Sequence, residues 1–161
     1  MIVVDTCIIS SLAKAGRLEL LRWFTEPCTS PGVVREISGS GNPDLAKCLS
    51  ESLADWLTVR TVKNPEELSS LLERYPVLGH VDCELILLSR ELKSALLTDD
   101  SQLIEEAETI FGIDTFDLRD VLVVLLKKHK IDDKQLDELI FNLEKKDHYK
   151  FSKESLRQLG R

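Results

Sequence analysis

The amino-acid sequence predicts an α/β fold: a three-layer α/β/α sandwich with a parallel sheet of about five strands and extra helices toward the C-terminus. Two observations predict this class. Short apolar segments alternate along the chain with longer segments whose apolar residues recur at helical spacing, which is typical of parallel strands joined by crossover helices. The chain has 161 residues, 43% of them hydrophobic, so one domain can bury such a core.

The expected strands are short, apolar and bounded by residues that favour turns. A β-branched run at residues 2–4 ends at Asp5, and Pro27 and Pro31 bracket a second short strand or bend. In chain order, we expect strands at residues 2–4, 28–30, 57–62, 94–98 and 112–116.

The expected helices begin with recognisable start signals. Asn64 followed by Pro65 and two glutamates is typical of a helix start, and Pro31 suits a first helical turn. Gly16 interrupts the helical spacing of residues 8–24, so two short helices fit there better than one. Further helices are expected to start at residues 31 and 64, and to span 45–56, 80–93, 102–110, 117–130, 132–146 and 154–159.

Composition restricts the class of partner and the compartment. The net charge is −7 and the pI is near 5.0, so nucleic acid would need a local basic patch or bound cations to approach. The four cysteines show no zinc-ligand spacing, and we interpret them as reduced apolar residues of a cytoplasmic protein. No apolar run approaches the length of a membrane span, so we expect no membrane association.

Acidic residues follow the predicted strands. Asp5 comes directly after the first strand, and Asp99 and Asp100 come directly after the fourth. In a parallel sheet these positions share one edge, where α/β folds form their sites. We also expect three acids from neighbouring helices near this edge: Glu36, Asp82 and Glu84.

Gathered carboxylates repel one another. Two unit charges about 4 Å apart cost on the order of 4 kcal/mol at an effective dielectric near 20. A hard divalent cation such as Mg²⁺ or Mn²⁺ relieves that repulsion. Each acid also has a purely structural explanation, as a helix cap or a partner of the helix dipole. Their common position at one edge favours a shared metal site.

Four segments resemble the PIN domain family, the compact fold of VapC-like metal-dependent ribonucleases. They are IVVDT, SPGVVREI, VDCELILLSRELKSALLTDDSQL and GIDTFDLRDVL. The resemblance covers residues 1–130 and implies a PIN-like nuclease domain there. Residues 131–161 are then expected to form a C-terminal helical extension packed on the same domain.

The resemblance implies a catalytic quartet of acids. Carried over position by position, these are Asp5, Glu36, Asp82 and Asp100, with Asp5, Asp82 and Asp100 as metal ligands. Asp100 is preferred to its neighbour because residues 98–100 match the family's Thr-x-Asp pattern.

Several further positions stay open. Asp82 and Glu84 lie about 200° apart around a helix, so both cannot easily coordinate the same ion. The spacing to Asp100 favours Asp82 as the third acid, with Glu84 as a reserve. Asp99 and Thr115 are possible additional site residues, although Thr115 could equally be an ordinary strand threonine. Cys7 stands where the family commonly has a small polar residue.

The function implied by the resemblance is a Mg²⁺- or Mn²⁺-dependent endoribonuclease that uses one or two ions. The same resemblance is compatible with the toxin of a toxin–antitoxin pair, homodimeric and blocked by a small antitoxin protein. The alternative is a non-catalytic PIN-like subunit that binds nucleic acid or acts as a scaffold.

Substrate contacts are the least specific feature of the sequence. Lys127, Lys128 and Lys130 form a basic cluster that could bind RNA or simply complement a helix dipole. Alternatively, Arg35 and the loop-like stretch SGSGNPD at residues 38–44 could hold the phosphate backbone, and we expect this stretch to be a mobile loop.

Two other folds with acids at strand ends are disfavoured. A phosphoacceptor receiver domain expects paired acids near the first strand and a lysine after the fifth, but Asp5 stands alone and residues 112–120 contain no lysine. A haloacid-type phosphatase needs an aspartate two residues after the first, where Cys7 stands.

Overall fold

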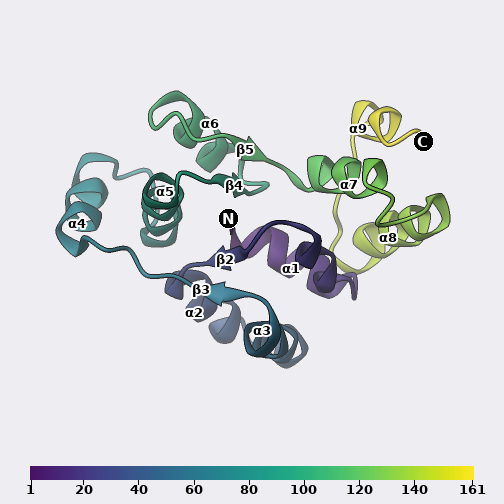
Figure 1. Cartoon of the computed structure of the whole chain (residues 1–161), viewed down its shortest axis with the longest axis horizontal. Coiled ribbons are helices and arrows are strands. Elements are labelled where there is room, and N and C mark those ends of the chain that lie inside the picture. The colour runs from purple at the N-terminus through teal and green to yellow at the C-terminus, as the bar shows by residue number, and fades with distance from the viewer.

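The computed structural model describes residues 1–161 and has the predicted architecture. Five parallel strands form one sheet in the order β3-β2-β1-β4-β5, and helices lie on both sides of it (Figure 1). The three-layer α/β/α class is therefore confirmed. The strands are β1 (Ile2–Val4), β2 (Pro27–Thr29), β3 (Thr58–Val59), β4 (Ala95–Leu97) and β5 (Thr115–Phe116).

Most helices start at the residues that the sequence indicated, because their caps are local. Ser30 and Asn64 accept hydrogen bonds from the backbone of the first helical turns, as expected. The helices are α1 (Thr6–Lys14), a 3-10 helix η1 (Leu18–Trp23), α2 (Pro31–Gly39), α3 (Pro43–Asp55), α4 (Pro65–Arg74), α5 (His80–Leu92), α6 (Ser101–Thr109), α7 (Leu118–Lys127), α8 (Asp133–Lys146) and α9 (Lys153–Gln158). None of them combines the length and the apolar character that a bilayer crossing requires.

The predicted mobile loop at residues 38–44 is largely helical. Helix α2 continues to Gly39 and α3 starts at Pro43, so only residues 40–42 connect them. The side chain of Asn42 caps α3 by accepting a hydrogen bond from Leu45 N–H at 3.1 Å. The expectation of a long loop over residues 38–44 was wrong, because serine and asparagine here serve the ends of two helices.

The order in which successive strands join the sheet reverses between β1 and β4. Strand β1 pairs with β2 on one side and with β4 on the other, and Val4 is in register with Leu97. The backbone N–H of Asp5 donates to Leu97 O at 3.0 Å, just beyond the paired residues. The carboxyl ends of β1 and β4 therefore meet at the switch point of the sheet, where α/β folds bind ligands.

Helix α5 is the most deeply buried helix. It contacts β1 and β4 on one side and α2 and α4 on others. Every residue from Cys83 to Ser89 is buried, including the carboxylate residue Glu84. Because α5 is covered almost all round, its hydrophobic pattern alone does not define a single inner face.

The C-terminal helices belong to the same core. Helix α8 packs against α1 and α7, and Leu136, Leu139 and Leu143 are buried within the core cluster that also contains β1. Figure 1 shows α7 and α8 beside α1, on the side of the sheet opposite to α4 and α5.

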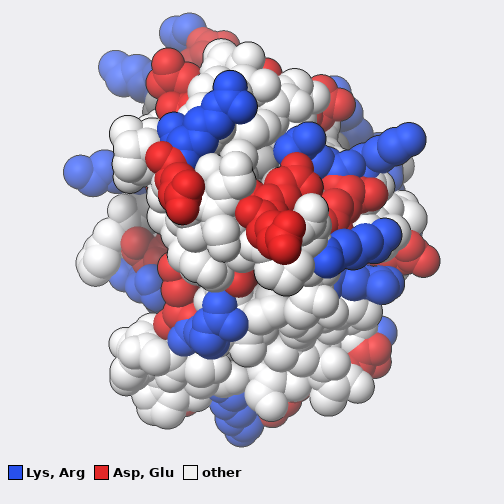
Figure 2. Space-filling view, turned by 90° about the vertical axis from the view of Figure 1, so that its left-hand side faces the viewer, with Lys and Arg blue, Asp and Glu red and all other residues white.

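The side of the molecule formed by α4 and α5 has mixed charge. Figure 2 views the left-hand side of Figure 1 and shows acidic and basic side chains next to one another, with apolar and neutral areas between them. This face therefore has no continuous positive field for nucleic acid, in keeping with the net charge of −7.

Candidate metal centre

Asp5 lies at the centre of the acidic edge. It follows β1, caps α1 and is only 7% exposed. Its Oδ1 accepts a hydrogen bond from Thr6 N–H at 2.5 Å, and its Oδ2 accepts from the Thr98 hydroxyl at 2.7 Å and the Cys7 thiol at 3.0 Å. These donors orient both carboxylate oxygens.

Asp100 lies on the neighbouring strand end. It caps α6, where its Oδ1 accepts from the backbone N–H groups of Gln102 at 2.9 Å and Leu103 at 3.1 Å. Its backbone N–H donates to the Thr98 hydroxyl oxygen at 3.1 Å, and the same hydroxyl donates to Asp5. Thr98 is fully buried and therefore links the two acids. In the sequence, Thr98 stands out only as part of a Thr-x-Asp pattern, which does not indicate this linking role.

Asp82 and Glu36 approach the same edge from helices. In the first turn of α5, Asp82 Oδ2 accepts from Gly79 N–H at 2.7 Å. In α2, Glu36 Oε2 accepts from the Thr6 hydroxyl at 2.5 Å, and this bond connects it to the start of α1. The two residues thus reach this edge from two different helices.

The charges of the four acids act on one another. Burial raises the pKa of Asp82, the Gly79 hydrogen bond partly offsets this, and the charges of Asp5, Asp100 and Glu36 raise it further. Side chains that lie 18 to 95 residues apart in the chain are therefore close enough to interact.

The free oxygens of these side chains suit a hard divalent cation. Oδ1 of Asp82, Oδ2 of Asp100 and Oε1 of Glu36 accept no hydrogen bond from the protein. Carboxylate oxygens are the ligands that Mg²⁺ and Mn²⁺ prefer. No three acidic, histidine or cysteine side chains lie close enough to form a ready-made coordination shell. Mutual repulsion of carboxylates favours such spacing.

A family model described as a PIN domain matches residues 1–160. The chain belongs to the PIN domain family. Among solved structures, it is similar to a PilT N-terminus domain protein from the hyperthermophilic archaeon Sulfolobus solfataricus P2, with a TM-score of 0.53 and 18% identity over 78% of this chain and 93% of that chain. At this identity the likeness concerns the fold alone. No curated protein matches the chain.

Within the PIN domain, Glu84 is bound to residues at the start of α2. It is 6% exposed, and its Oε2 accepts from Gly32 N–H at 2.8 Å, at the start of α2. Its Oε1 lies 3.2 Å from Arg35 Nη2 and 3.4 Å from His80 Nδ1. Glu84 therefore joins α5 to α2, and these contacts favour Asp82 over Glu84 as the third acid.

Replacing Glu84 by alanine separates these two roles. The variant leaves the Gly32 N–H and the Arg35 guanidinium without their partner, so we expect unfolding to become easier by about 1–3 kcal/mol. Mn²⁺ affinity should stay near that of the unaltered protein. Urea unfolding and Mn²⁺ titration measure the two effects.

The exposed Glu51→Ala variant is the control and should change stability by less than about 0.5 kcal/mol, since its pair with Lys47 is at the surface. A Glu84→Ala protein of normal stability that no longer bound Mn²⁺ would instead make Glu84 a ligand.

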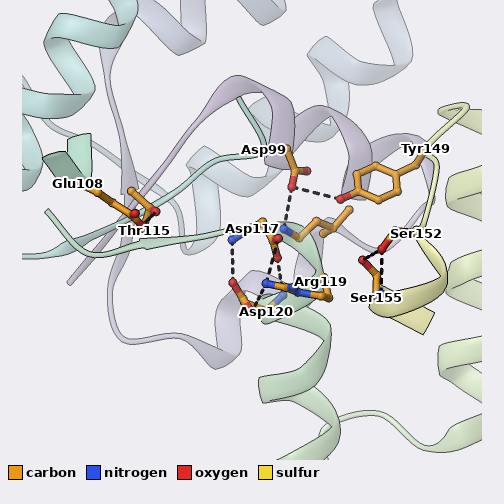
Figure 3. Close-up of polar contacts among 10 residues, drawn as sticks. Asp99, Glu108, Thr115, Asp117, Arg119, Asp120, Tyr149, Ser152 and Ser155 are labelled. Atoms are coloured by element: carbon orange, nitrogen blue, oxygen red, sulfur yellow. Dashed lines mark hydrogen bonds and ion pairs between the residues drawn. The ribbon is translucent and has the colours of Figure 1, made fainter. Parts of the chain in front are cut away.

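Asp99 turns to the opposite side of its strand end from Asp100. Its Oδ1 accepts from Leu118 N–H at 2.9 Å and from the Tyr149 hydroxyl at 3.2 Å (Figure 3). Burial raises the pKa of Asp99, and the Leu118 hydrogen bond opposes that rise. Asp99 therefore connects β4 with α7 and the C-terminal segment. These contacts favour a structural role for Asp99 over an additional role in the metal site.

Thr115 also lies outside the acidic group. Its hydroxyl donates to Glu108 Oε1, a contact between β5 and α6 that Figure 3 shows well apart from Asp99. Of the two alternatives for Thr115, this contact favours the ordinary strand threonine, because its hydroxyl already has a partner in α6.

The basic cluster does not border the acids. Lys130 Nζ lies 3.9 Å from the centre of the Trp23 ring, and Trp23 precedes β2, near the edge where the strands begin. Asp5 and Asp100 lie where the strands end. Lys127 and Lys128 belong to the same C-terminal end of α7. Arg35 is nearer to the acids, but Glu84 holds it while its side chain stays 62% exposed.

Cys7 takes part in the hydrogen bonding around Asp5. Its thiol donates to Asp5 Oδ2, and its sulfur accepts from Asp99 N–H at 3.1 Å. Burial, followed by the charge of Asp5, raises the pKa of Cys7 well above its usual range, so the group stays protonated at neutral pH. It can therefore serve as a hydrogen-bond donor to the Asp5 carboxylate.

Cys7→Ser is expected to retain the fold and Mn²⁺ binding, because a hydroxyl can make both hydrogen bonds. Cys7→Ala leaves the Asp99 N–H without its partner and removes one donor from Asp5, so we expect a loss of about 1–3 kcal/mol in the free energy of unfolding. Urea unfolding of the two variants checks this. Equal stability of the serine and alanine variants would contradict it.

Proposed function

We propose that this PIN domain is a metal-dependent endoribonuclease that hydrolyses phosphodiester bonds in RNA. The observation that supports it best is the convergence of four acids. The Thr98 hydroxyl links Asp5 to Asp100, and Thr6 links Asp5 to Glu36. The charges of these three acids raise the pKa of Asp82. This convergence lies at the switch point between β1 and β4, where the fold binds ligands.

In this proposal Asp5, Asp82 and Asp100 hold one or two Mg²⁺ or Mn²⁺ ions. A bound ion lowers the pKa of a coordinated water and offsets the negative charge that grows on the phosphate oxygens. Thr98 and Cys7 orient the Asp5 carboxylate, and the backbone at the start of α6 orients that of Asp100. Such outer hydrogen bonds fix ligand positions.

Glu36 and Arg35 are the proposed contacts to water and substrate. Glu36 keeps one oxygen without a hydrogen bond while Thr6 holds the other, so it can accept a proton from an attacking water. Arg35 is the nearest exposed cation from the same helix, and it can meet a backbone phosphate at the rim of the site. The lysines of α7 are too remote for this task.

Cleavage of a labelled single-stranded RNA tests the proposal. We expect internal cleavage with Mn²⁺, none with EDTA, and recovery when Mn²⁺ is added in excess over EDTA. Cleavage that EDTA leaves unchanged would rule out a metal-dependent mechanism.

A non-catalytic PIN-like binding subunit is the second candidate. It is favoured by the absence of three ligands in a ready-made arrangement. Mn²⁺ or RNA binding without any cleavage would support this candidate. A toxin role, with a small antitoxin as partner, extends the first proposal: expression of the chain should then arrest growth, and expression of the Asp5→Asn variant should not.

A further inference from the structure

The segment between α8 and α9 contacts helix α1 and the residues that follow β4. We call residues 147–149 the C-terminal clasp. They follow the last turn of α8, and the backbone N–H of Tyr149 donates to Leu143 O at 3.1 Å. His148 adopts a left-handed conformation with φ of 56°, which few non-glycine residues adopt without support from their surroundings.

One end of the clasp is fastened to α1. Asp147 accepts hydrogen bonds from the Ser11 hydroxyl at 2.5 Å and from Lys14 Nζ at 2.7 Å. The Asp147 side chain is 11% exposed, and Ser11 is buried. A charge-assisted pair at this depth is better protected from solvent than a surface ion pair. The clasp thus contacts the helix that Asp5 begins.

The other end of the clasp is fastened to the segment after β4. The Tyr149 hydroxyl donates to Asp99 Oδ1, the oxygen that also accepts from Leu118 N–H (Figure 3). Burial and the charges of Asp99 and Asp117 raise the pKa of Tyr149 above its usual range, so the hydroxyl keeps its proton as a donor. The Tyr149 ring also packs against Phe151, with ring centres 4.7 Å apart.

The contact between Tyr149 and Asp99 matters because Asp99 directly precedes Asp100. Its side chain is held by Tyr149 and Leu118, and its backbone N–H by Cys7. The next residue is Asp100, whose backbone N–H is held by Thr98. Rotation of the Asp99 backbone would therefore move the Asp100 carboxylate.

We propose that Tyr149 is a positioning residue, which fixes the Asp99–Asp100 segment from the C-terminal clasp and thereby holds the Asp100 carboxylate in place for a divalent cation. The metal part of this inference rests on the proposed function. The positioning part concerns only the chain itself. The C-terminal extension is then a component of the site as well as of the core.

Tyr149→Phe tests the inference, because it removes one hydroxyl and keeps the ring. Tyr75→Phe is the matched control: Tyr75 is also half-buried and packs edge-on against Phe111, with ring centres 5.3 Å apart, and its hydroxyl makes no hydrogen bond to the protein. The first measurement is amide hydrogen exchange of residues 98–103. The second is Mn²⁺ affinity from titration calorimetry.

Loss of one such hydrogen bond should speed exchange in residues 98–103 by about 2- to 10-fold in Tyr149→Phe. Mn²⁺ affinity should fall by a similar factor. Tyr75→Phe should change neither quantity. Unchanged exchange in Tyr149→Phe would overturn the positioning role, and faster exchange with unchanged Mn²⁺ affinity would overturn its link to the metal centre.

The two proposals fail in different ways. If the unaltered protein binds no Mn²⁺, the proposed function fails and the metal part of this inference fails with it. The exchange measurement still decides whether Tyr149 fixes the segment after β4.

Discussion

Asp5→Asn and Asp100→Asn are each expected to reduce Mn²⁺-dependent RNA cleavage by more than about 100-fold. Loss of a residue that merely supports a metal ligand typically costs about 10- to 100-fold, and a ligand should cost more. In Asp100→Asn, the asparagine oxygen can accept the hydrogen bonds from the start of α6, so the loss arises from the missing charge. In Asp5→Asn, the oxygen can accept from Thr98 and Cys7, but the amide nitrogen then faces Thr6 N–H, so the melting temperature of this variant should also fall.

Initial cleavage rates at saturating Mn²⁺ measure this effect, and circular dichroism melting verifies the fold of each variant. Asp44→Asn is the control, because Asp44 is an exposed acid in the first turn of α3, outside the acidic group. An Asp5→Asn variant that cleaved RNA at the normal rate would contradict the proposed role of Asp5 as a metal ligand.

Asp82→Asn is expected to change thermal stability in opposite directions with and without metal, relative to the unaltered protein. Without metal it should raise the melting temperature at pH 7, because it removes a carboxylate that other carboxylates repel. Mn²⁺ at about 100 times its dissociation constant should stabilise the unaltered protein by about 2.7 kcal/mol, or about 5–10 °C in melting temperature. In Asp82→Asn most of that increase should disappear.

The pH dependence of stability gives a second measurement on Asp82. Its pKa in the folded protein is raised above the ordinary value of 3.8, so the folded state binds the proton more tightly than the unfolded state. Stability from this group is therefore highest at low pH and falls as pH rises from about its unfolded pKa through its folded pKa. The difference between Asp82→Asn and the unaltered protein in urea should grow over that window. A difference that stayed constant with pH would show that the pKa of Asp82 is not raised in the folded protein.

The strand ends were predictable because their signals are local. Short apolar runs end at Asp5 and at Asp99–Asp100, and the structure puts β1 and β4 at those places. Parallel pairing then brings the two ends together without further information. The caps at Ser30 and Asn64 were equally local, since each bonds within its own first turn.

The choice between Asp82 and Glu84 could not be made from the sequence. Both stand near the start of α5, and only the rotation of that helix decides which acid faces the strand ends. Because α5 is buried on nearly every side, its apolar pattern does not fix that rotation. The contact of Glu84 with Gly32, which lies in another helix, favours Asp82.

Contacts between distant segments were also beyond local reasoning. Nothing near Thr115 indicates that Glu108 would take its hydroxyl, and nothing near Lys130 indicates that its ammonium would lie over Trp23. The hydrogen bond from Tyr149 to Asp99 spans 50 residues. Such pairings depend on how helices pack on the sheet.

The approach of Gly32 to Glu84 has a consequence for the history of the family. A Cβ atom on residue 32 would lie 2.5 Å from Glu84 Oε2 and 2.8 Å from a methyl group of Val81, so a side chain there and a glutamate at 84 exclude each other. Homologous sequences should therefore show the two positions changing together: glycine at the first wherever glutamate occupies the second, and a shorter residue at the second wherever the glycine has been lost.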